Sequence, residues 1–113
     1  MALREPSYFI LAALVNGPAH GYGIIQEATD LSEGRVRLSA GTLYGALERL
    51  ASEGLVEPDH EEVVSGRRRR YFRLTGVGES ALAEESERMR SAAEAVEARL
   101  SGLRSLRSKG ASA

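Results

Sequence analysis

The chain has 113 residues, of which 42% are hydrophobic and 27% are charged, and its formal net charge is −1. This length fits one domain with a modest core that benefits from a partner subunit, and the composition is ordinary for a soluble globular protein. The chain has no cysteine, which excludes disulfide bridges and thiolate metal sites and fits the reducing conditions of the cytoplasm.

Charge is distributed unevenly along the chain. Residues 67–73 carry five arginines and no acidic residue, whereas residues 79–97 carry six glutamates. One end of the molecule can therefore be basic while the other is acidic. Because a local basic patch matters more than the sum of charges, the net charge of −1 does not exclude a nucleic-acid partner.

The first helix is expected from about Pro6, which suits a first helical turn, to the pair Gly17-Pro18, which ends it. Its inward face is formed by three aliphatic residues, Leu11, Leu14 and Val15. The apolar run within it, residues 8–15, is too short to span a membrane and follows charged residues. We therefore expect neither a transmembrane segment nor a secretory signal.

A second helix is expected to begin near His20 or Gly21. Tyr22, Ile25 and Ala28 share one side of it, so Tyr22 is interpreted as a core residue. His20 is expected to act in the turn or as a cap. A transition-metal site would need both histidines of the chain plus carboxylates, so neither a metal nor a cofactor is expected. Residues 32–38 are predicted to form a loop or a short extended piece.

The third helix is predicted to run from its N-cap, Ser39, to Glu53, and to end at Gly54. One side is buried, because three leucines fall at i, i+4 and i+7: Leu43, Leu47 and Leu50. The opposite side can enter a DNA major groove and presents Gly41, Thr42, Tyr44, Gly45, Glu48 and Arg49.

Three residues of that outer side also have structural interpretations. The ring of Tyr44 can pack against a following hairpin, or its hydroxyl can contact a phosphate or a base. Thr42 can assist the helix N-terminus, where it also suits a phosphate or a thymine methyl group. Arg49 can contact DNA, or it can pair with Glu53 one turn later in a weak surface interaction.

A β-hairpin is predicted next. Its first strand opens at Leu55-Val56, and Pro58 marks that strand as an edge strand. Ser65-Gly66 is the signal of a two-residue turn, and residues 67–74 form the returning strand. Alternation along the returning strand points two residues inward, Phe72 and Leu74, and two outward, Tyr71 and Arg73.

The two-residue turn sets a register that pairs Val63 with Arg68, Glu62 with Arg69, and Glu61 with Arg70. Opposite charges across strands contribute about 0.2–1 kcal/mol each. Arg69 and Arg70 can therefore be neutralised by these glutamates or can contact phosphates, and both alternatives stay open. Arg67 and Arg68 lie at the tip with no acidic neighbour in this register and are the stronger candidates for DNA contacts.

Thr75 is expected to cap a last helix that runs from about Val77 to about Leu106. An apolar residue recurs at every seventh position, which is typical of a seam that packs against another helix. The start of the seam can cover the protein's own core, but its later part extends beyond what so small a domain covers, which favours self-association. The expected dimer interface is Leu82, Met89, Val96, Leu100 and Leu103, with Ala93 filling the seam.

Three blocks of sequence resemble the signature blocks of the PadR family: HGYGI at 20–24, GTLYGALERLASEGLV at 41–56 and GRRRRYFRLTGVGESAL at 66–82. They occur in that family's order and spacing. The family consists of bacterial winged-helix transcriptional regulators, so the resemblance implies a mostly α fold with a small β-hairpin. A winged helix-turn-helix, residues 1–75, would precede a long C-terminal dimerisation helix, residues 76–107. The tail, residues 108–113, is expected to be disordered.

The resemblance also implies a function: a homodimer that binds a palindromic, double-stranded DNA operator, with the helix from Ser39 as recognition helix and residues 65–69 as wing tip. The expected regulator is a cytoplasmic repressor that a small-molecule effector of unknown identity can release. The candidate DNA-binding residues are Ser39, Gly41, Thr42, Tyr44, Arg49, Arg67, Arg68 and Arg69.

Two positions depart from the family's usual pattern. Gly45 stands where a proline usually follows the TLY motif, and glycine there loosens the helix by about 1 kcal/mol relative to alanine. Arg68 stands in place of the usual proline of the arginine block and adds charge to the wing. An operator sequence therefore cannot be carried over from the family.

The sequence shows no nucleophile elbow, no phosphate-cradling loop and no paired acids with a plausible pocket, so an enzyme is not expected. The alternative function is a winged-helix module that binds a protein, in which the arginine tip meets an acidic partner and the third helix is a scaffold. Duplex binding that weakens steeply with added salt distinguishes a DNA-binding protein from such a module.

Overall fold

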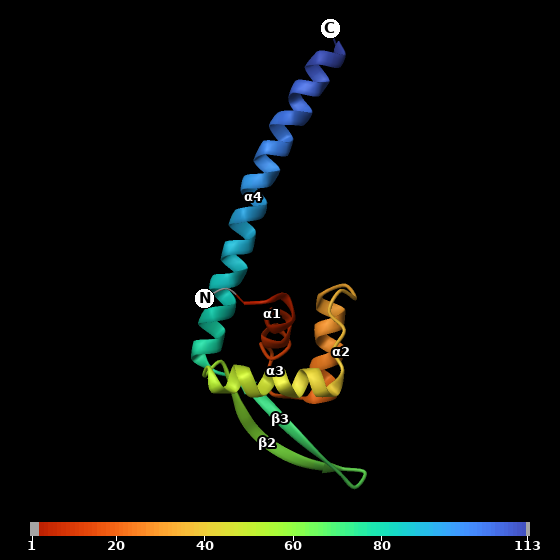
Figure 1. Cartoon of the computed structure of the whole chain (residues 1–113), viewed down its shortest axis with the longest axis vertical. Coiled ribbons are helices and arrows are strands. Elements are labelled where there is room, and N and C mark those ends of the chain that lie inside the picture. Colours follow the sequence, from red (N-terminus) through yellow and green to blue (C-terminus); the bar gives the residue numbers. More distant parts are fainter. Residues whose placement is uncertain (1–2, 113) are drawn as a thin grey trace. The chain divides into compact units, whose positions relative to one another are not determined.

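The computed structural model describes residues 3–112. Along the chain the elements are α1 (Glu5–Ala12), β1 (Ala19–His20), α2 (Gly21–Leu31), α3 (Ala40–Ser52), β2 (Val56–Val64), β3 (Arg67–Leu74) and α4 (Gly76–Ser112), as Figure 1 shows. The chain separates into two compact units, Met1–Ala83 and Glu84–Ala113. The first turns of α4 thus belong to the first unit. The predicted fold class, mostly α with a small β-hairpin and a long last helix, is confirmed.

The first two helices form where predicted, but each departs from the predicted burial pattern. Leu11 and Leu14 are buried as expected, but Val15 is 58% exposed. The helix ends at Ala12, so Val15 lies in the following turn, where helical periodicity no longer sets the direction of a side chain. In α2 the buried residues are Gly21, Ile24 and Ala28.

The hairpin has the predicted turn and register. Ser65 and Gly66 both have positive φ, 51° and 77°, the backbone of the type I′ turn that suits two-residue hairpins. Strand order is β1-β3-β2, so β2 is an edge strand, as its proline predicts. The pairs Val63–Arg68, Glu62–Arg69 and Glu61–Arg70 are observed. β1, which pairs with β3 over only two residues, was not predicted.

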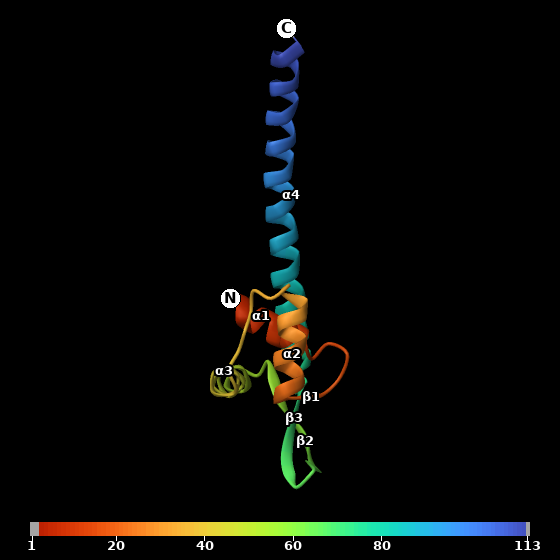
Figure 2. The same ribbon diagram turned by 90° about the vertical axis from the view of Figure 1, so that its right-hand side faces the viewer.

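The core of the first unit lies between α3 and the other elements. Its fully buried side chains come from α1, α2, α3 and β2, and they include Ile10, Leu11, Ile24, Leu43, Leu47, Leu50 and Val56. In Figure 2, α3 is seen end-on beside the other two helices, with the hairpin below. One side of α3 therefore faces the core while the other stays at the surface.

The start of α4 closes the base of the hairpin. The Thr75 hydroxyl accepts a hydrogen bond from the Gly78 N–H at 3.0 Å, which confirms Thr75 as the cap. A Cβ atom at Gly78 would lie 2.0 Å from the Leu55 carbonyl oxygen and 2.8 Å from Leu74. Only glycine fits between the helix and the two strand ends at this point.

The last helix is longer than predicted, because α4 is helical through Ser112. The structure thus draws residues 108–112 as helix, the disorder expected of the tail stays a prediction, and residue 113 lies outside the described residues. Arg104, Arg107 and Lys109 lie near this end of the helix, where positive charge interacts favourably with the helix dipole.

Candidate nucleic-acid interface

The exposed start of α3 is the first part of the interface. Ser39 is the N-cap, and its hydroxyl oxygen accepts a hydrogen bond from the Thr42 N–H at 3.2 Å and donates one to the Thr42 hydroxyl at 3.0 Å. Both residues are exposed, as is Gly41. The positive end of the helix dipole and two hydroxyl groups are therefore open to solvent, an arrangement that suits a phosphate.

The two faces of α3 differ as predicted. The leucines of the inner face are at most 1% exposed, whereas Thr42, Tyr44 and Glu48 of the outer face are exposed. A Cβ atom at Gly41 or at Gly45 would meet no atom within 4 Å. Within the described part of the protein, the outer face of α3 is therefore uncovered at these glycines and has room for another molecule.

Tyr44 lies between the outer face of α3 and the hairpin. Its ring centroid is 6.4 Å from that of Phe72 on β3, and a Cβ atom at Gly21 would lie 2.6 Å from its hydroxyl oxygen. The ring therefore packs against the hairpin and the start of α2. This agrees with the structural interpretation of Tyr44 made from the sequence. It remains 39% exposed, so part of it is still accessible.

Arg49 has a structural partner that the sequence did not indicate. Its guanidinium donates a hydrogen bond to the hydroxyl of Ser7 on α1 at 3.2 Å, and no ion pair with Glu53 is found among the described residues. Ser7 is 5% exposed. The guanidinium is thus directed toward α1, so Arg49 is a weaker candidate for a DNA contact than the sequence indicates.

Tyr22 at the start of α2 is a candidate that the sequence analysis missed. It was interpreted as a core residue, but it is 70% exposed, and Ile24 is buried instead. The helix begins at Gly21, as predicted, and His20 caps it, since its Nδ1 accepts a hydrogen bond from the Gly23 N–H at 3.4 Å. The buried side is nevertheless displaced by one residue from the one inferred, to Gly21 and Ile24.

A hollow joins these elements to the wing tip, residues 65–69. It has a volume of about 420 Å³. Figure 1 shows the hairpin running beneath α3 toward the end where that helix begins. Two tyrosines, three arginines and the start of α2 line the hollow: His20, Gly21, Tyr22, Tyr44, Arg67, Arg68 and Arg69. A concave surface that combines guanidinium and phenol groups can hold the phosphate backbone of a duplex.

The arginines of the wing differ in their partners. Arg68 forms an ion pair with Glu61 at 3.5 Å, so the inference that it has no acidic neighbour is wrong: a diagonal neighbour on the other strand reaches it. Arg70 lies over the Phe72 ring at 5.3 Å. Arg67 and Arg69 form no ion pair within residues 3–112. The two direct cross-strand ion pairs considered for Arg69 and Arg70 are thus not formed, but Arg69 still helps to lower the pKa of Glu62 and hydrogen-bonds with Tyr71.

Glu62 belongs to a cluster at the base of the hairpin that we call the base network. Its members are Glu57, Asp59, His60, Glu62, Tyr71 and Arg73. The Tyr71 hydroxyl donates to Glu62 at 2.9 Å, and the rings of His60 and Tyr71 stack with centroids 4.3 Å apart. Arg73 pairs with Glu57 and with Asp59. These contacts hold the two strands together where the hairpin leaves the core.

Hydrogen bonds set the charges of the base network. The bond to Asp59 raises the pKa of His60, and a second bond, to Glu62, acts in the same direction. The bond with His60 lowers the pKa of Asp59. The Tyr71 hydroxyl, followed by His60, lowers the pKa of Glu62. The network therefore favours a protonated His60 between two carboxylates.

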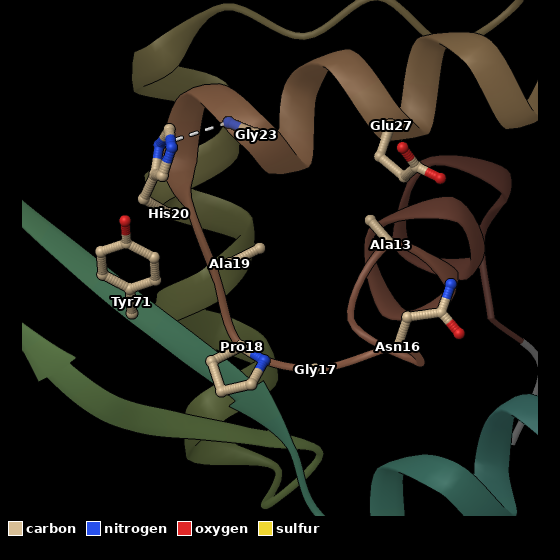
Figure 3. Close-up of a pocket in the computed structure, with 9 residues that line it drawn as sticks. All are labelled: Ala13, Asn16, Gly17, Pro18, Ala19, His20, Gly23, Glu27 and Tyr71. Atoms are coloured by element: carbon tan, nitrogen blue, oxygen red, sulfur yellow. Dashed lines mark hydrogen bonds between the residues drawn. The ribbon is translucent and has the colours of Figure 1, made fainter.

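A second hollow lies behind the start of α2, with a volume of about 470 Å³. Figure 3 shows His20 and Tyr71 on one side of it and Asn16 and Glu27 on the other. The His20 and Tyr71 rings meet edge to face at 5.3 Å. Tyr71 thus connects this hollow to the base network.

Among residues 3–112 there is no group of three or more histidine and carboxylate side chains that could hold a metal ion. No described helix has both the length and the apolar character needed to cross a membrane.

The predicted dimer interface falls on both units. Leu82 is half-buried and packs against the core of the first unit, which was the alternative interpretation for the start of the seam. The later seam residues are exposed in the single chain: Met89, Val96, Leu100 and Leu103.

Three packed helices, an N-capped third helix with a bare polar face, and an arginine-tipped hairpin define a winged-helix protein. The chain belongs to the transcriptional regulator PadR-like family, which it matches over residues 10–84. This confirms the resemblance seen in the sequence. It also confirms that the chain is not an enzyme, because members of the family are transcriptional regulators.

Relatives by sequence include the transcriptional regulator Rv3488 of Mycobacterium tuberculosis, 41% identical over 76 residues that cover 67% of this chain and 67% of that protein. A 37.1 kDa protein in transposon TN4556 of Streptomyces fradiae is 39% identical over 102 residues. That match covers 90% of this chain but only 26% of the length of the Streptomyces protein.

Solved structures share the fold. A PadR-like transcription factor of Bacteroides fragilis is 36% identical, with a TM-score of 0.66, over 80% of this chain and 85% of that one. Bacillus subtilis PadR in complex with operator DNA has a TM-score of 0.62 at 22% identity, over 72% of this chain and 46% of that one.

Proposed function

We propose that this chain is a sequence-specific DNA-binding regulator, a repressor, that binds a palindromic operator as a homodimer. The observation that carries the proposal is the hollow that Tyr44 of α3 shares with Tyr22 and the wing arginines, on a helix whose outer face is uncovered at Gly41 and Gly45. The operator complex of Bacillus subtilis PadR, a protein of the same fold, supports a DNA partner. A repressor of this kind acts in the cytoplasm, where the chromosome is accessible.

In the proposed complex the α3 helix enters the major groove and reads bases with its exposed first turns. Ser39, Gly41 and Thr42 approach the duplex with the helix N-terminus, and Tyr44 contacts it with its exposed edge. Tyr22 joins the set because it is exposed beside the same hollow. Arg49 is left out because Ser7 holds its guanidinium.

The wing tip would grip the phosphate backbone beside that groove. Arg67 is the primary contact, because it forms no ion pair with a carboxylate among the described residues. Arg69 lies beside it but also interacts with the Glu62 carboxylate and the Tyr71 hydroxyl. Arg68 would have to exchange Glu61 for a phosphate. Since Glu61 and Arg68 are both largely exposed, such an ion pair is weak and its exchange costs little.

The exposed seam of α4 would join two chains and set the distance between their two recognition helices. Recognition helices of a dimer read half-sites about 34–36 Å apart, or a multiple of that. A small-molecule effector that changed this spacing would release the operator, because a dimer loses both contacts when the geometry fails. Val96→Asp is expected to give monomers in sedimentation, whereas a dimer that persisted would place the interface elsewhere.

Salt dependence of binding to a duplex from the chain's own promoter tests the proposal. Each phosphate contact should contribute about −0.9 to the slope of log K against log salt concentration. Arg67→Ala combined with Arg69→Ala should lower the affinity for all sequences about equally and should reduce the slope by about two. Tyr44→Ala should also change sequence preference.

Arg90→Ala is the matched control, because Arg90 is paired with glutamates of its own helix and lies outside the proposed surface. An unchanged affinity of the double arginine variant would overturn the wing assignment. A folded dimer that binds no duplex at low salt would overturn DNA binding itself and would favour a protein-interaction module.

A further inference from the structure

Arg69 of the wing tip has an acidic residue directly across the hairpin, yet no ion pair joins the two in the part of the chain that the structure describes. That residue is Glu62, and an opposite-charge pair at such positions is normally favourable. The Glu62 carboxylate instead accepts from the Tyr71 hydroxyl at 2.9 Å and lies 3.3 Å from Nε2 of His60. Two members of the base network therefore occupy the carboxylate that would otherwise neutralise Arg69.

Tyr71 connects the arginine to this carboxylate. The Tyr71 hydroxyl, followed by His60 and with Arg69 acting in the same direction, lowers the pKa of Glu62. Glu62 in turn raises the pKa of Tyr71, while a hydrogen bond from Arg69 acts in the opposite direction. Arg69 and Glu62 thus lie on either side of one hydroxyl group. Rotation of their side chains, without a change of strand register, is enough to bring them together.

A β-bulge assembles the acidic side of this arrangement. The register shifts between Pro58 and His60, so Asp59 is an extra residue in β2. Successive side chains of a strand normally point to opposite faces, but a bulge lets two neighbours share a face. Nδ1 of His60 accordingly contacts the Asp59 carboxylate. Normal alternation then places Glu62 on the same face as His60.

The contacts of His60 require a proton on both of its ring nitrogens. Nδ1 faces the Asp59 carboxylate and Nε2 faces the Glu62 carboxylate. An ionised carboxylate only accepts hydrogen bonds, and a neutral imidazole has one N–H to donate. Loss of a proton from His60 therefore ends one of the two contacts. The contact to Glu62 is the longer one, so Glu62 is the carboxylate that is released.

Charged and titratable groups of three strands surround His60. Arg73 is paired with Asp59, and the ring of His20 meets that of Tyr71 edge to face at 5.3 Å. Histidine is the residue type whose charge ordinarily changes between about pH 5 and 8, so a test must separate His60 from His20. The surrounding groups are Asp59 and Glu62 on β2, Arg69, Tyr71 and Arg73 on β3, and His20 on β1.

We propose that Glu62 competes with the operator for Arg69, and that protonated His60, together with Tyr71, holds Glu62 away from it. When His60 loses its proton, Glu62 pairs with Arg69 and removes it from the phosphate backbone. Operator affinity then falls as pH rises. The inference rests on the DNA binding of the proposed function and adds to it a control of one wing contact.

The expected effect is modest, because the side chains of His60 and Glu62 are 41% and 48% exposed and exposed ion pairs are weak. We expect the affinity for a duplex to fall about two- to fivefold between about pH 6 and pH 8.5. The bonds to Asp59 and then to Glu62 raise the pKa of His60. The midpoint of the fall should therefore lie above about 6.5, the ordinary value for histidine.

Binding of the full chain to a duplex from its own promoter, measured across this pH range at constant ionic strength, tests the proposal. His60→Gln should remove the pH dependence. His20→Asn, which keeps a side chain that can cap α2, should retain it. Circular dichroism checks that each variant is folded. A full pH dependence in folded His60→Gln would overturn the proposal.

The two wing arginines Arg67 and Arg69 provide a matched pair of variants. Arg69→Ala and Arg67→Ala should each weaken binding, but only Arg69→Ala should also abolish the pH dependence. Arg67 forms no ion pair among residues 3–112, so its removal should leave the pH dependence intact. If Arg69→Ala kept the full pH dependence, His60 would act on the duplex through its own charge, and competition by Glu62 would be overturned.

Glu62→Gln tests the competing carboxylate directly. A neutral amide can still accept from Tyr71 but cannot pair with Arg69, so this variant should keep high affinity at about pH 8.5. Glu61→Gln is the control, because Glu61 pairs with Arg68, and it should leave the pH dependence unchanged. A folded Glu62→Gln variant that loses affinity with rising pH as the unaltered chain does would contradict the proposal.

NMR of the protein without DNA separates this inference from the proposed function. The side-chain N–H signal of Arg69 should shift with the titration of His60, and it should not do so in Glu62→Gln. Such coupling in a protein that binds no duplex would overturn the proposed function and support the contact between Glu62 and Arg69. Duplex binding that does not depend on pH, with an Arg69 signal that ignores His60, would overturn this inference alone.

Discussion

The two ends of the β2–β3 hairpin use charged side chains in opposite ways. In the base network, Glu62 accepts from Tyr71 and contacts His60, and Arg73 holds two carboxylates. At the wing tip, Arg67 forms no ion pair among the described residues, whereas Arg69 still interacts with Glu62 and Tyr71 of the base network. Charges that satisfy one another stabilise the hairpin, whereas charges without a partner in the chain are available for a ligand. Local partners, not residue type, separate the two roles.

The largest expected difference between the two ends concerns stability. Gly78→Ala forces a Cβ against the Leu55 carbonyl at the base of the hairpin and should destabilise the protein by about 3 kcal/mol, measured by urea unfolding. Gly45→Ala is the control. It meets nothing within 4 Å and should stabilise the protein by about 1 kcal/mol. Equal effects of the two changes would contradict this account of the base.

A glycine at the tip should matter less. Gly66 has a φ of 77°, so Gly66→Ala is expected to cost about 1–2 kcal/mol in urea unfolding. Ser65→Gly, at a φ of 51°, removes an existing strain of the same kind and should give a small gain. An equal loss of unfolding free energy in Gly66→Ala and Gly78→Ala would contradict the view that packing is tighter at the base than at the tip.

The base network should also make the hairpin sensitive to pH. Because its bond to Asp59 raises the pKa of His60, the contribution of His60 to stability is full below its ordinary pKa of about 6.5. That contribution is lost as pH rises through the raised value. For Asp59 and Glu62 the pKa is lowered, so their contribution is lost only in acid, below the ordinary values near about 4.

The hairpin should therefore be most stable at mildly acidic pH. An NMR titration of the His60 ring measures its pKa directly. His60→Gln should remove the loss of stability on the alkaline side. A His60 that titrates at or below its ordinary value would contradict the network.

The smallest effect is expected at the tip. Glu61→Gln removes the carboxylate 3.5 Å from Arg68 and should raise affinity for a duplex by at most about fivefold, since exposed pairs contribute at most about 1 kcal/mol. Glu57→Gln, which acts on the base, should leave Arg68 as it is. Tighter binding by the base variant would reverse the roles assigned to the two ends.

The sequence predicts the local part of this molecule well. The bounds of α3, its N-cap, the hairpin turn and the register of the strands follow from caps, periodicity and turn chemistry. All of these depend on residues a few positions apart. The base network was not predicted as a unit, although the register was correct, because it needs the actual rotamers of six side chains.

Contacts between distant segments could not be read in this way. Arg49 bonds to Ser7, 42 residues earlier, and Tyr22 is exposed because the core contacts the side of α2 that carries Gly21, Ile24 and Ala28. β1 exists only because its two residues lie beside β3. The sequence pattern therefore identifies which surface is polar. Tertiary packing decides which side chains of that surface already contact another part of the chain.

The strand β1 has a mechanical consequence. His20 pairs with Tyr71 of β3, and the next residue begins α2. No linker residue therefore separates the sheet from the second helix. A force that displaces the hairpin is passed directly to the end of α2 that carries Tyr22. The hairpin and the start of α2 would then move together, so both would bind or release a duplex at the same time.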